Sequence, residues 1–263
     1  MSAPIATRRM RVEALRERHP FAAELLTLYG ALLEVWDGVG ESPPDPGDVA
    51  AWAAERVVPG VVEATEAAGP PALAEAVRGR SEDALAGWLA GAELDPVDRY
   101  LARASLSPVL EALGERAGDV CAPGSGAELC PRCGGAPQLS YLEASGESLV
   151  SGPRSLLCAR CGASWTCSRT ICPACGERQE SQLSVHAEHW HGPVSGRRDG
   201  NGQPLFPHLR IAACSTCSNY LIEVDMARDG RAVPEVDELT ALPLDLYAAD
   251  QGLKKVTPNL MGF

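Results

Sequence analysis

The chain has 263 residues, of which 45% are hydrophobic and 22% are charged, and its net charge at pH 7 is −12. These fractions are those of an ordinary globular protein and exclude a disordered or collagen-like chain. The acidic balance argues against nucleic-acid binding, because clustered Lys and Arg supply that affinity by neutralising phosphates.

The sequence predicts no membrane insertion and no export by the general signal-peptide route. It contains no run of about 18 uncharged apolar residues, the minimum length for a transmembrane helix. The N-terminal stretch carries arginines and glutamates without an apolar signal core.

Residues 1–120 contain no cysteine and are rich in Ala, Leu, Val and Glu. Asp95 followed by Pro96 is a helix start, since aspartate caps the helix and proline is tolerated at its first position. We predict about five helices here, packed as an irregular bundle. One of them places apolar residues at intervals of three and four, at Leu25, Leu28, Tyr29, Leu32 and Trp36.

The pattern changes after a linker predicted at residues 118–126. Residues 138–143 and 155–157 predict a short hairpin, and residues 209–213 and 220–225 predict two further strands. Residues 236–251 are apolar at helical spacing, which predicts one amphipathic helix that ends at Gly252.

The cysteines carry the clearest chemical signal. Ten are present, and eight of them form pairs with two residues between the members. In a chain without an export signal, such pairs are typical of metal ligands rather than of a disulfide framework. The candidate metal ligands are Cys130, Cys133, Cys158, Cys161, Cys172, Cys175, Cys214 and Cys217.

Eight cysteines supply two closed four-thiolate sites, a ligand set that suits zinc or a single iron. Spacing favours sequential pairing, with the first two pairs forming one site and the last two the other, and leaves nested and interleaved pairing open. Glycine follows the second cysteine in three of the four turns, where it permits a positive φ, and Ser218 follows it in the fourth. A closed site has no open position for water, so we expect no hydrolysis at these metals.

Other candidate residues are interpreted as non-ligands. Cys121 and Cys167 have no identifiable base beside them in sequence and are predicted to be inert, half-buried thiols. His186, His189 and His191 are predicted to be exposed loop residues or a partner-contact patch, because eight thiolates already satisfy two sites.

From Cys130 onward the sequence resembles the formate dehydrogenase accessory protein FdhE family. The resemblance rests on CPRCGG, LLCARCGASW, CPACG and LRIAACSTCSNYLIEVD, and most specifically on the tail from Arg231 to Leu260, which holds no metal ligand. It implies a helical domain followed by two rubredoxin-like units, with all eight paired cysteines as metal ligands. It also implies a cytoplasmic assembly factor that contacts the molybdenum- or tungsten-containing catalytic subunit before export, and is not itself an enzyme.

The sequence therefore predicts a multidomain α+β protein. Its parts are a helical domain at 1–120, a first rubredoxin-like or zinc-ribbon-like unit at 126–166, and a second unit with a C-terminal helix at 167–263. We expect two tetrahedral metal ions, zinc or iron, and a formate dehydrogenase catalytic subunit as partner, with no nucleic acid and a homodimer left open. The alternatives are a rubredoxin-like electron carrier with iron sites and a zinc-ribbon binding module.

Overall fold

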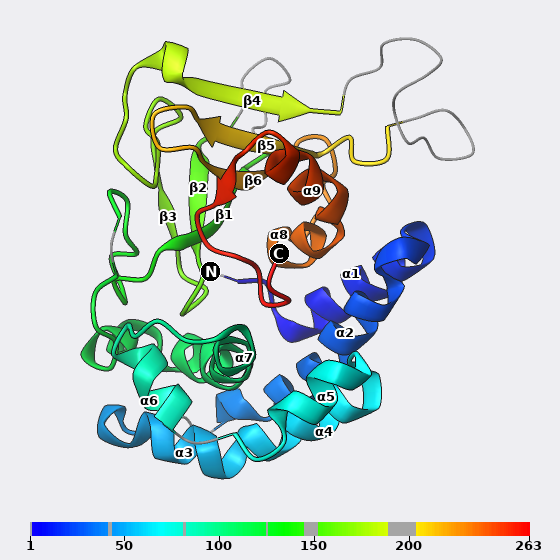
Figure 1. The fold of residues 1–263 in the computed structure, drawn as a ribbon, viewed down its shortest axis with the longest axis vertical. Helices are drawn as coiled ribbons and strands as arrows, with labels where there is room; N and C mark the ends of the chain where they lie inside the picture. Colours follow the sequence, from blue (N-terminus) through cyan, green and yellow to red (C-terminus); the bar gives the residue numbers. More distant parts are fainter. Residues whose placement is uncertain (1, 42–43, 81–82, 125, 145–151, 189–203) are drawn as a thin grey trace.

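The computed structural model describes residues 2–41, 44–80, 83–124, 126–144, 152–188 and 204–263. Helices form the N-terminal part, and a mixed sheet with two C-terminal helices forms the rest (Figure 1). The predicted α+β class, a helical part followed by two four-cysteine clusters, is confirmed.

The helical part contains more helices than the sequence predicted. A new helix begins at Val58 with Pro59 in its first turn, and Pro71 begins the helix that follows it, because proline lacks the N–H that would continue a preceding helix. Seven α-helices instead of about five lie in its described residues: α1 Ile5–Arg18, α2 Ala23–Asp37, α3 Val49–Arg56, α4 Val58–Ala68, α5 Pro71–Val77, α6 Asp83–Leu89 and α7 Pro96–Leu113.

Helix α7 is the central helix of this part. The predicted cap is present, since the Asp95 side chain accepts hydrogen bonds from the backbone N–H groups of Val97 and Asp98. Trp36 on α2 donates from Nε1 to the Ala104 carbonyl at 2.9 Å, and the Tyr100 hydroxyl lies 2.7 Å from Thr65 Oγ1 on α4. Fully buried leucines from α2 and α7 pack around these hydrogen bonds.

The sheet has seven strands, and it contains segments of both cysteine-bearing units. The order is β3-β2-β1-β6-β5-β4, with β7 also paired to β6. The predicted hairpin is confirmed as β1 and β2, and the two later predicted strands as β5 and β6. The bounds are β1 Pro137–Leu142, β2 Arg154–Cys158, β3 Ser164–Thr166, β4 Leu183–Ala187, β5 Leu209–Cys214, β6 Asn219–Asp225 and β7 Lys254–Lys255.

A parallel pairing joins the two cysteine-bearing segments. Ser140 on β1 lies opposite Glu223 on β6, and β6 also pairs in parallel with the short strand β7. The first unit therefore shares one continuous sheet with the second. The three domain boundaries stay a prediction.

The prediction of one continuous C-terminal helix at residues 236–251 is wrong. Two helices, α8 Pro234–Asp237 and α9 Leu242–Asp250, flank a 3₁₀ turn at Glu238–Thr240. Pro243 lies in the first turn of α9, so it begins that helix instead of interrupting a longer one. Ala241 and Ala248 pack against one face of the sheet with Ile211 and Ile222.

Buried charges join the helical part to the C-terminal segment where α1 lies beside α8 (Figure 1). Arg11 on α1 donates from Nε to Asp237 at 2.9 Å and from Nη2 to Asp229 at 2.8 Å. His208 Nε2 lies 2.7 Å from the same Asp237 carboxylate. Burial opposes ionisation of Asp237, but hydrogen bonds from His208 and Arg11 outweigh it and hold the pKa of this carboxyl below its usual value.

A second polar network fixes the C-terminal tail. The Lys255 side chain is buried, with Nζ 2.8 Å from Glu238 and 3.1 Å from Asp245. Glu238 also accepts a hydrogen bond from Gln138 on β1, whose amide oxygen accepts one from Arg103 on α7. Burial lowers the pKa of Arg103 to about 10. These contacts give structural roles to residues of the tail that resembles the FdhE family.

The buried His19 side chain makes the free energy of unfolding depend on pH. Its side chain is fully buried against the Phe206 ring, and neither ring nitrogen has a hydrogen-bond partner among the described residues. Burial, then the nearby Arg18 and His208, lower the pKa of His19 from 6.5 to about 4. The unfolded chain therefore binds a proton more readily than the folded chain between these values.

We expect the free energy of unfolding to fall as the pH drops from about 6.5 to about 4. One pKa unit corresponds to about 1.4 kcal/mol, so His19 accounts for at most about 3 kcal/mol of that loss. Urea unfolding across this pH range measures it. A His19→Phe variant, which keeps a ring on Phe206, should show a flatter pH dependence; an equally steep one would contradict the assignment.

Candidate metal centres

The structure brings the eight paired cysteines together in two clusters. The first cluster is Cys130, Cys133, Cys158 and Cys161, and the second is Cys172, Cys175, Cys214 and Cys217. Within each cluster all four sulfur atoms lie within 4.8 Å of one another. This is the sequential pairing, so the nested and interleaved alternatives are excluded.

Each cluster is built from turns of one repeated form. In three of them the first cysteine donates its backbone N–H to the carbonyl five residues later, as Cys130 does to Gly135 at 2.8 Å. Gly134, Gly162 and Gly176 have φ values of +66°, +62° and +78°. Ser218 has φ +55° and is the only non-glycine residue with positive φ in the described part of the chain. The fourth turn therefore uses the same left-handed conformation without glycine.

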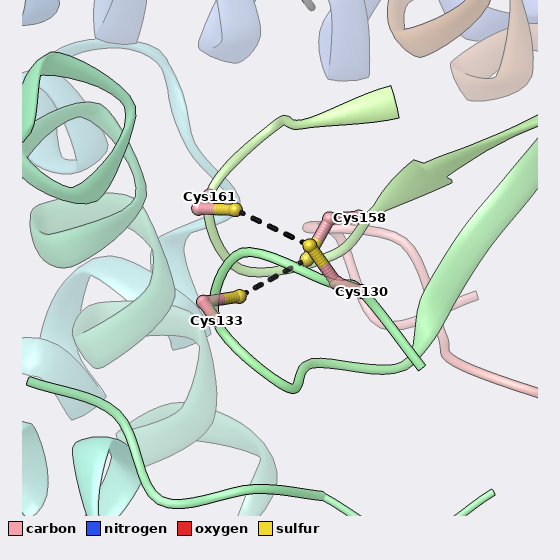
Figure 2. A group of neighbouring side chains, drawn as sticks. All are labelled: Cys130, Cys133, Cys158 and Cys161. Carbon is pink, nitrogen blue, oxygen red and sulfur yellow. Dashed lines mark hydrogen bonds between the residues drawn. The ribbon is translucent and has the colours of Figure 1, made fainter. Parts of the chain in front are cut away.

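The sulfur spacing fits a tetrahedral metal. A tetrahedron with metal–sulfur distances of about 2.3 Å has sulfur–sulfur edges of about 3.8 Å. In the first cluster, the Sγ atoms of Cys130 and Cys161 lie 3.8 Å apart, and those of Cys133 and Cys158 lie 3.4 Å apart (Figure 2). In the second cluster, the pairs Cys172–Cys217 and Cys175–Cys214 are each separated by 3.8 Å. Both clusters could hold a metal ion.

The chemistry of four crowded thiols also favours a cation. Hydrogen bonds with Cys130, and then burial, raise the pKa of Cys158 and Cys161, because thiols that are crowded together away from water favour the neutral form. A divalent cation reverses this balance, since it binds thiolates and releases their protons.

The first cluster lies inside the protein core. All four of its cysteines are buried and belong to the same apolar cluster as the leucines of α2 and α7. Arg103, Arg132 and Arg160 supply positive charge or hydrogen bonds near its sulfur atoms. Arg160 donates its backbone N–H to Cys158 Sγ, and its guanidinium lies over the Trp88 ring and bonds the Ala122 carbonyl at 2.6 Å. The shared apolar core and the Arg160 contacts therefore attach the first cluster to the helical part.

The second cluster lies at the surface. Cys175 is exposed and Cys217 is half-buried, whereas Cys172 and Cys214 are buried. Its nearest charged neighbour along the chain, Glu177, is anionic and accepts a hydrogen bond from Thr216 at 2.8 Å. Backbone hydrogen bonds from Gln179, with the Thr216 bond, lower the pKa of the Glu177 carboxyl.

If each cluster holds a metal ion, we expect a chelator to remove the ion of the second cluster faster, because only the second cluster presents an exposed cysteine to solvent. A metal-binding dye should report two phases, each of one equivalent. Cys175→Ser should eliminate the faster phase and leave the slower one. A single phase with two equivalents would contradict this order.

The residues interpreted as non-ligands lie in three different environments. Cys167 is buried beside Leu156 and Leu221, and burial raises the pKa of its thiol. Cys121 is half-buried, and its interaction with Cys133 lowers the pKa of the Cys121 thiol, a relation to the first cluster that its position in a presumed linker did not reveal. His186 lies on β4, with ring nitrogens near Ser184 and the Tyr247 hydroxyl, while His189 and His191 lie outside the described residues.

One further group of potential ligands comprises His208, Asp229 and Asp237. The Arg11 guanidinium donates hydrogen bonds to both carboxylates, so its own positive charge neutralises this group without a metal ion. Sequence reasoning missed it because Arg11 and Asp237 are 226 positions apart. We interpret it as an ion-pair network.

The fold and the cluster positions can be compared with known proteins. No family model matches the chain. The chain is 31% identical over 134 residues to the Protein FdhE homolog of Aquifex aeolicus, covering 51% of this chain and 41% of that protein. It is also 31% identical over 135 residues to the Protein FdhE homolog of Pseudomonas aeruginosa, covering 51% of this chain and 39% of that one.

The resemblance to the FdhE family is confirmed. The crystal structure of the FdhE protein from Pseudomonas aeruginosa matches 98% of this chain and 95% of that chain, with a TM-score of 0.66 and 22% identity, which shows a shared fold. The sequence matches to the curated relatives span about two fifths of their length. No helix in the described part of the chain is long and apolar enough to cross a membrane.

Proposed function

We propose that the eight paired cysteines bind two metal ions, zinc or iron, one in each cluster. The proposal is supported by the sulfur spacing of both clusters, which matches the edges of a thiolate tetrahedron. A metal in the first cluster would fasten β1 and β2 to the helices. A metal in the second would fix the turns around Cys175 at the surface.

We further propose that the protein is an accessory factor for the maturation of respiratory formate dehydrogenase. In this role it binds the enzyme's catalytic subunit in the cytoplasm and does not itself oxidise formate. The similarity to FdhE homologues carries this proposal. The closed four-sulfur clusters support the absence of catalysis, because they offer no open position where a metal could bind substrate or water.

The exposure of Cys175 favours a second candidate function, electron transfer. A four-thiolate iron site changes its charge by one electron, and a ligand sulfur at the surface gives a redox partner a short path to it. Protein purified without added metal tests this candidate, since ferric thiolate absorbs visible light and zinc thiolate does not, and a colourless zinc protein would exclude electron transfer at these sites.

Deleting the chain in its native cells is expected to abolish or strongly reduce respiratory formate oxidation while the dehydrogenase polypeptide remains present. Tagged protein should co-purify the catalytic subunit. A variant with serine at both Cys161 and Cys214, one position in each cluster, should fail to restore formate oxidation in the deletion strain. The Cys167→Ser variant should restore it. Normal formate oxidation in the deletion strain, with no dehydrogenase subunit co-purified, would reject the accessory role.

A further inference from the structure

Strand β4 is an unprotected edge of the sheet. In the described part of the chain it pairs only with β5, and the strand at the opposite end of the sheet, β3, has three residues (Figure 1). Natural proteins usually protect edge strands with charged side chains, proline or a bulge, because the free N–H and C=O groups of an edge pair with other chains. Strand β4, with the sequence Leu-Ser-Val-His-Ala, contains neither a charged residue nor proline, and its register with β5 has no bulge.

The register with β5 defines which backbone groups of β4 face outward. Just before the strand, Ser215 donates its N–H to the Gln182 carbonyl at 2.9 Å. Residues of an antiparallel pair alternate between bonding the neighbouring strand and facing away from it, so the even-numbered positions of β4 bond β5. The outward-facing residues are Leu183, Val185 and Ala187. The Leu183 N–H already bonds the Glu180 carbonyl, which leaves the Leu183 C=O and both backbone groups of the other two residues for a further strand.

Exposed apolar side chains flank the same edge on both faces of the sheet. Six large apolar side chains are exposed among the described residues, and three of them lie on β4 or on the helix that contacts it. Val185 is 59% exposed, on the face that it shares with Ala212 of β5. On the other face the His186 ring contacts Tyr247 of α9, which is exposed together with its neighbour Leu246. Exposed apolar side chains gathered at one place are typical of a protein–protein interface.

The edge also lacks charge in an acidic protein. The net charge of the chain is −12, so two copies repel each other over most of their surfaces. Residues 181–187 contain no Asp, Glu, Lys or Arg. The acidic residue that follows, Glu188, accepts the backbone N–H of Phe206 at 2.9 Å and is thereby held within its own chain. A second copy can therefore approach this edge with little charge repulsion.

We propose that two copies of this chain pair through β4, antiparallel and about a twofold axis at Val185. In this register Val185 lies opposite Val185 of the second copy, and Leu183 lies opposite Ala187 of the second copy. The outward N–H and C=O groups of Val185 then bond their own counterparts, and the Ala187 N–H bonds the Leu183 C=O, so that one short segment complements itself. The apolar side chains of the two strands meet on one face of a continuous sheet. This pairing goes beyond the accessory role and does not depend on it.

Sedimentation equilibrium of the full chain measures the pairing. We expect the mass to rise from the 27.7 kDa of one chain toward twice that value at concentrations up to about 100 µM, because a short edge contact forms a weak, micromolar dimer. Hydrogen exchange locates the contact, since the amides of Val185 and Ala187 should exchange more slowly as the dimer forms. A chain that stays monomeric over this range, or a dimer without protection of these amides, would overturn the proposal.

Opposite charges at position 185 test the twofold register. Val185→Lys and Val185→Glu should each be monomeric, because the register places two like charges directly opposite each other. An equimolar mixture of the two variants should associate about tenfold more tightly than either variant alone, since lysine then faces glutamate. The exposure of Val185 means that neither variant disturbs the core, and unchanged thermal unfolding of both confirms that they are folded.

Met10→Lys and Met10→Glu are the matched controls. Met10 on α1 is 68% exposed, so the same substitutions are made at an exposed apolar residue away from the sheet. Both variants should dimerise like the unchanged chain, separately and mixed. Equal weakening by substitutions at Met10 and Val185, unchanged dimerisation of Val185→Lys, or a mixture that associates no more tightly than its separate components would each reject pairing through β4.

Discussion

Replacing Cys161 by serine is expected to remove one metal equivalent and to destabilise both the sheet and the helical part. Cys161 is fully buried, and its cluster belongs to the same apolar core as the leucines of α7. Metal binding at a four-cysteine site is also folding free energy, so losing it should cost on the order of 5 kcal/mol or more. Metal analysis and thermal unfolding followed by far-ultraviolet circular dichroism measure both effects.

Cys167→Ser is the matched control for this experiment. Cys167 is also a buried cysteine, but it packs with Leu156 and Leu221 outside both clusters. It should keep both metal equivalents and change stability only through the small loss of an apolar contact. Cys161 is preferable to Cys133 as the test position, because Cys121 interacts with Cys133 and could supply a replacement sulfur there. An unchanged metal content in Cys161→Ser would reject the ligand assignment.

The two cysteine clusters were predictable because their signal is local. A cysteine pair with two intervening residues fixes its own turn, and the short chain between successive pairs limits which turns can meet. The hairpin between the first two pairs follows from the same reasoning, as alternating residues bounded by turn residues predict β1 and β2. Even the glycine positions anticipated the positive φ values at Gly134, Gly162 and Gly176.

The relation between the parts was not predictable from such local patterns. The parallel pairing of β1 with β6 joins residues more than 80 positions apart, as in Ser140 and Glu223. The apolar pattern is almost continuous around Val57 and Pro243, so it does not show where one helix ends and the next begins. Proline and packing against the core decide these boundaries. A hollow on one face of the sheet could not be predicted for a similar reason, because the residues that line it, such as Arg154 and Arg210, meet only after the sheet has formed.

The buried ion pair between Arg11 and Asp237 leads to the second large expected effect. Asp237→Asn keeps the shape of the side chain but removes the negative charge that faces Arg11 and His208. Breaking a buried pair by removing one partner typically costs about 3–5 kcal/mol, and because Asp229 still faces Arg11 at 2.8 Å, we expect a cost toward the lower end of this range. We therefore expect a large fall in the free energy of unfolding, measured by urea titration at neutral pH.

An exposed pair on the same helix provides the control. Asp37 lies 3.1 Å from Arg9 on α1 but is more than half exposed, so Asp37→Asn should change stability by less than about 1 kcal/mol. Combining Asp237→Asn with Arg11→Met should cost less than the sum of the two single changes, because the double variant leaves less unpaired charge buried. Additive costs, or equal effects at Asp37 and Asp237, would show that this contact does not hold α1 to the C-terminal segment.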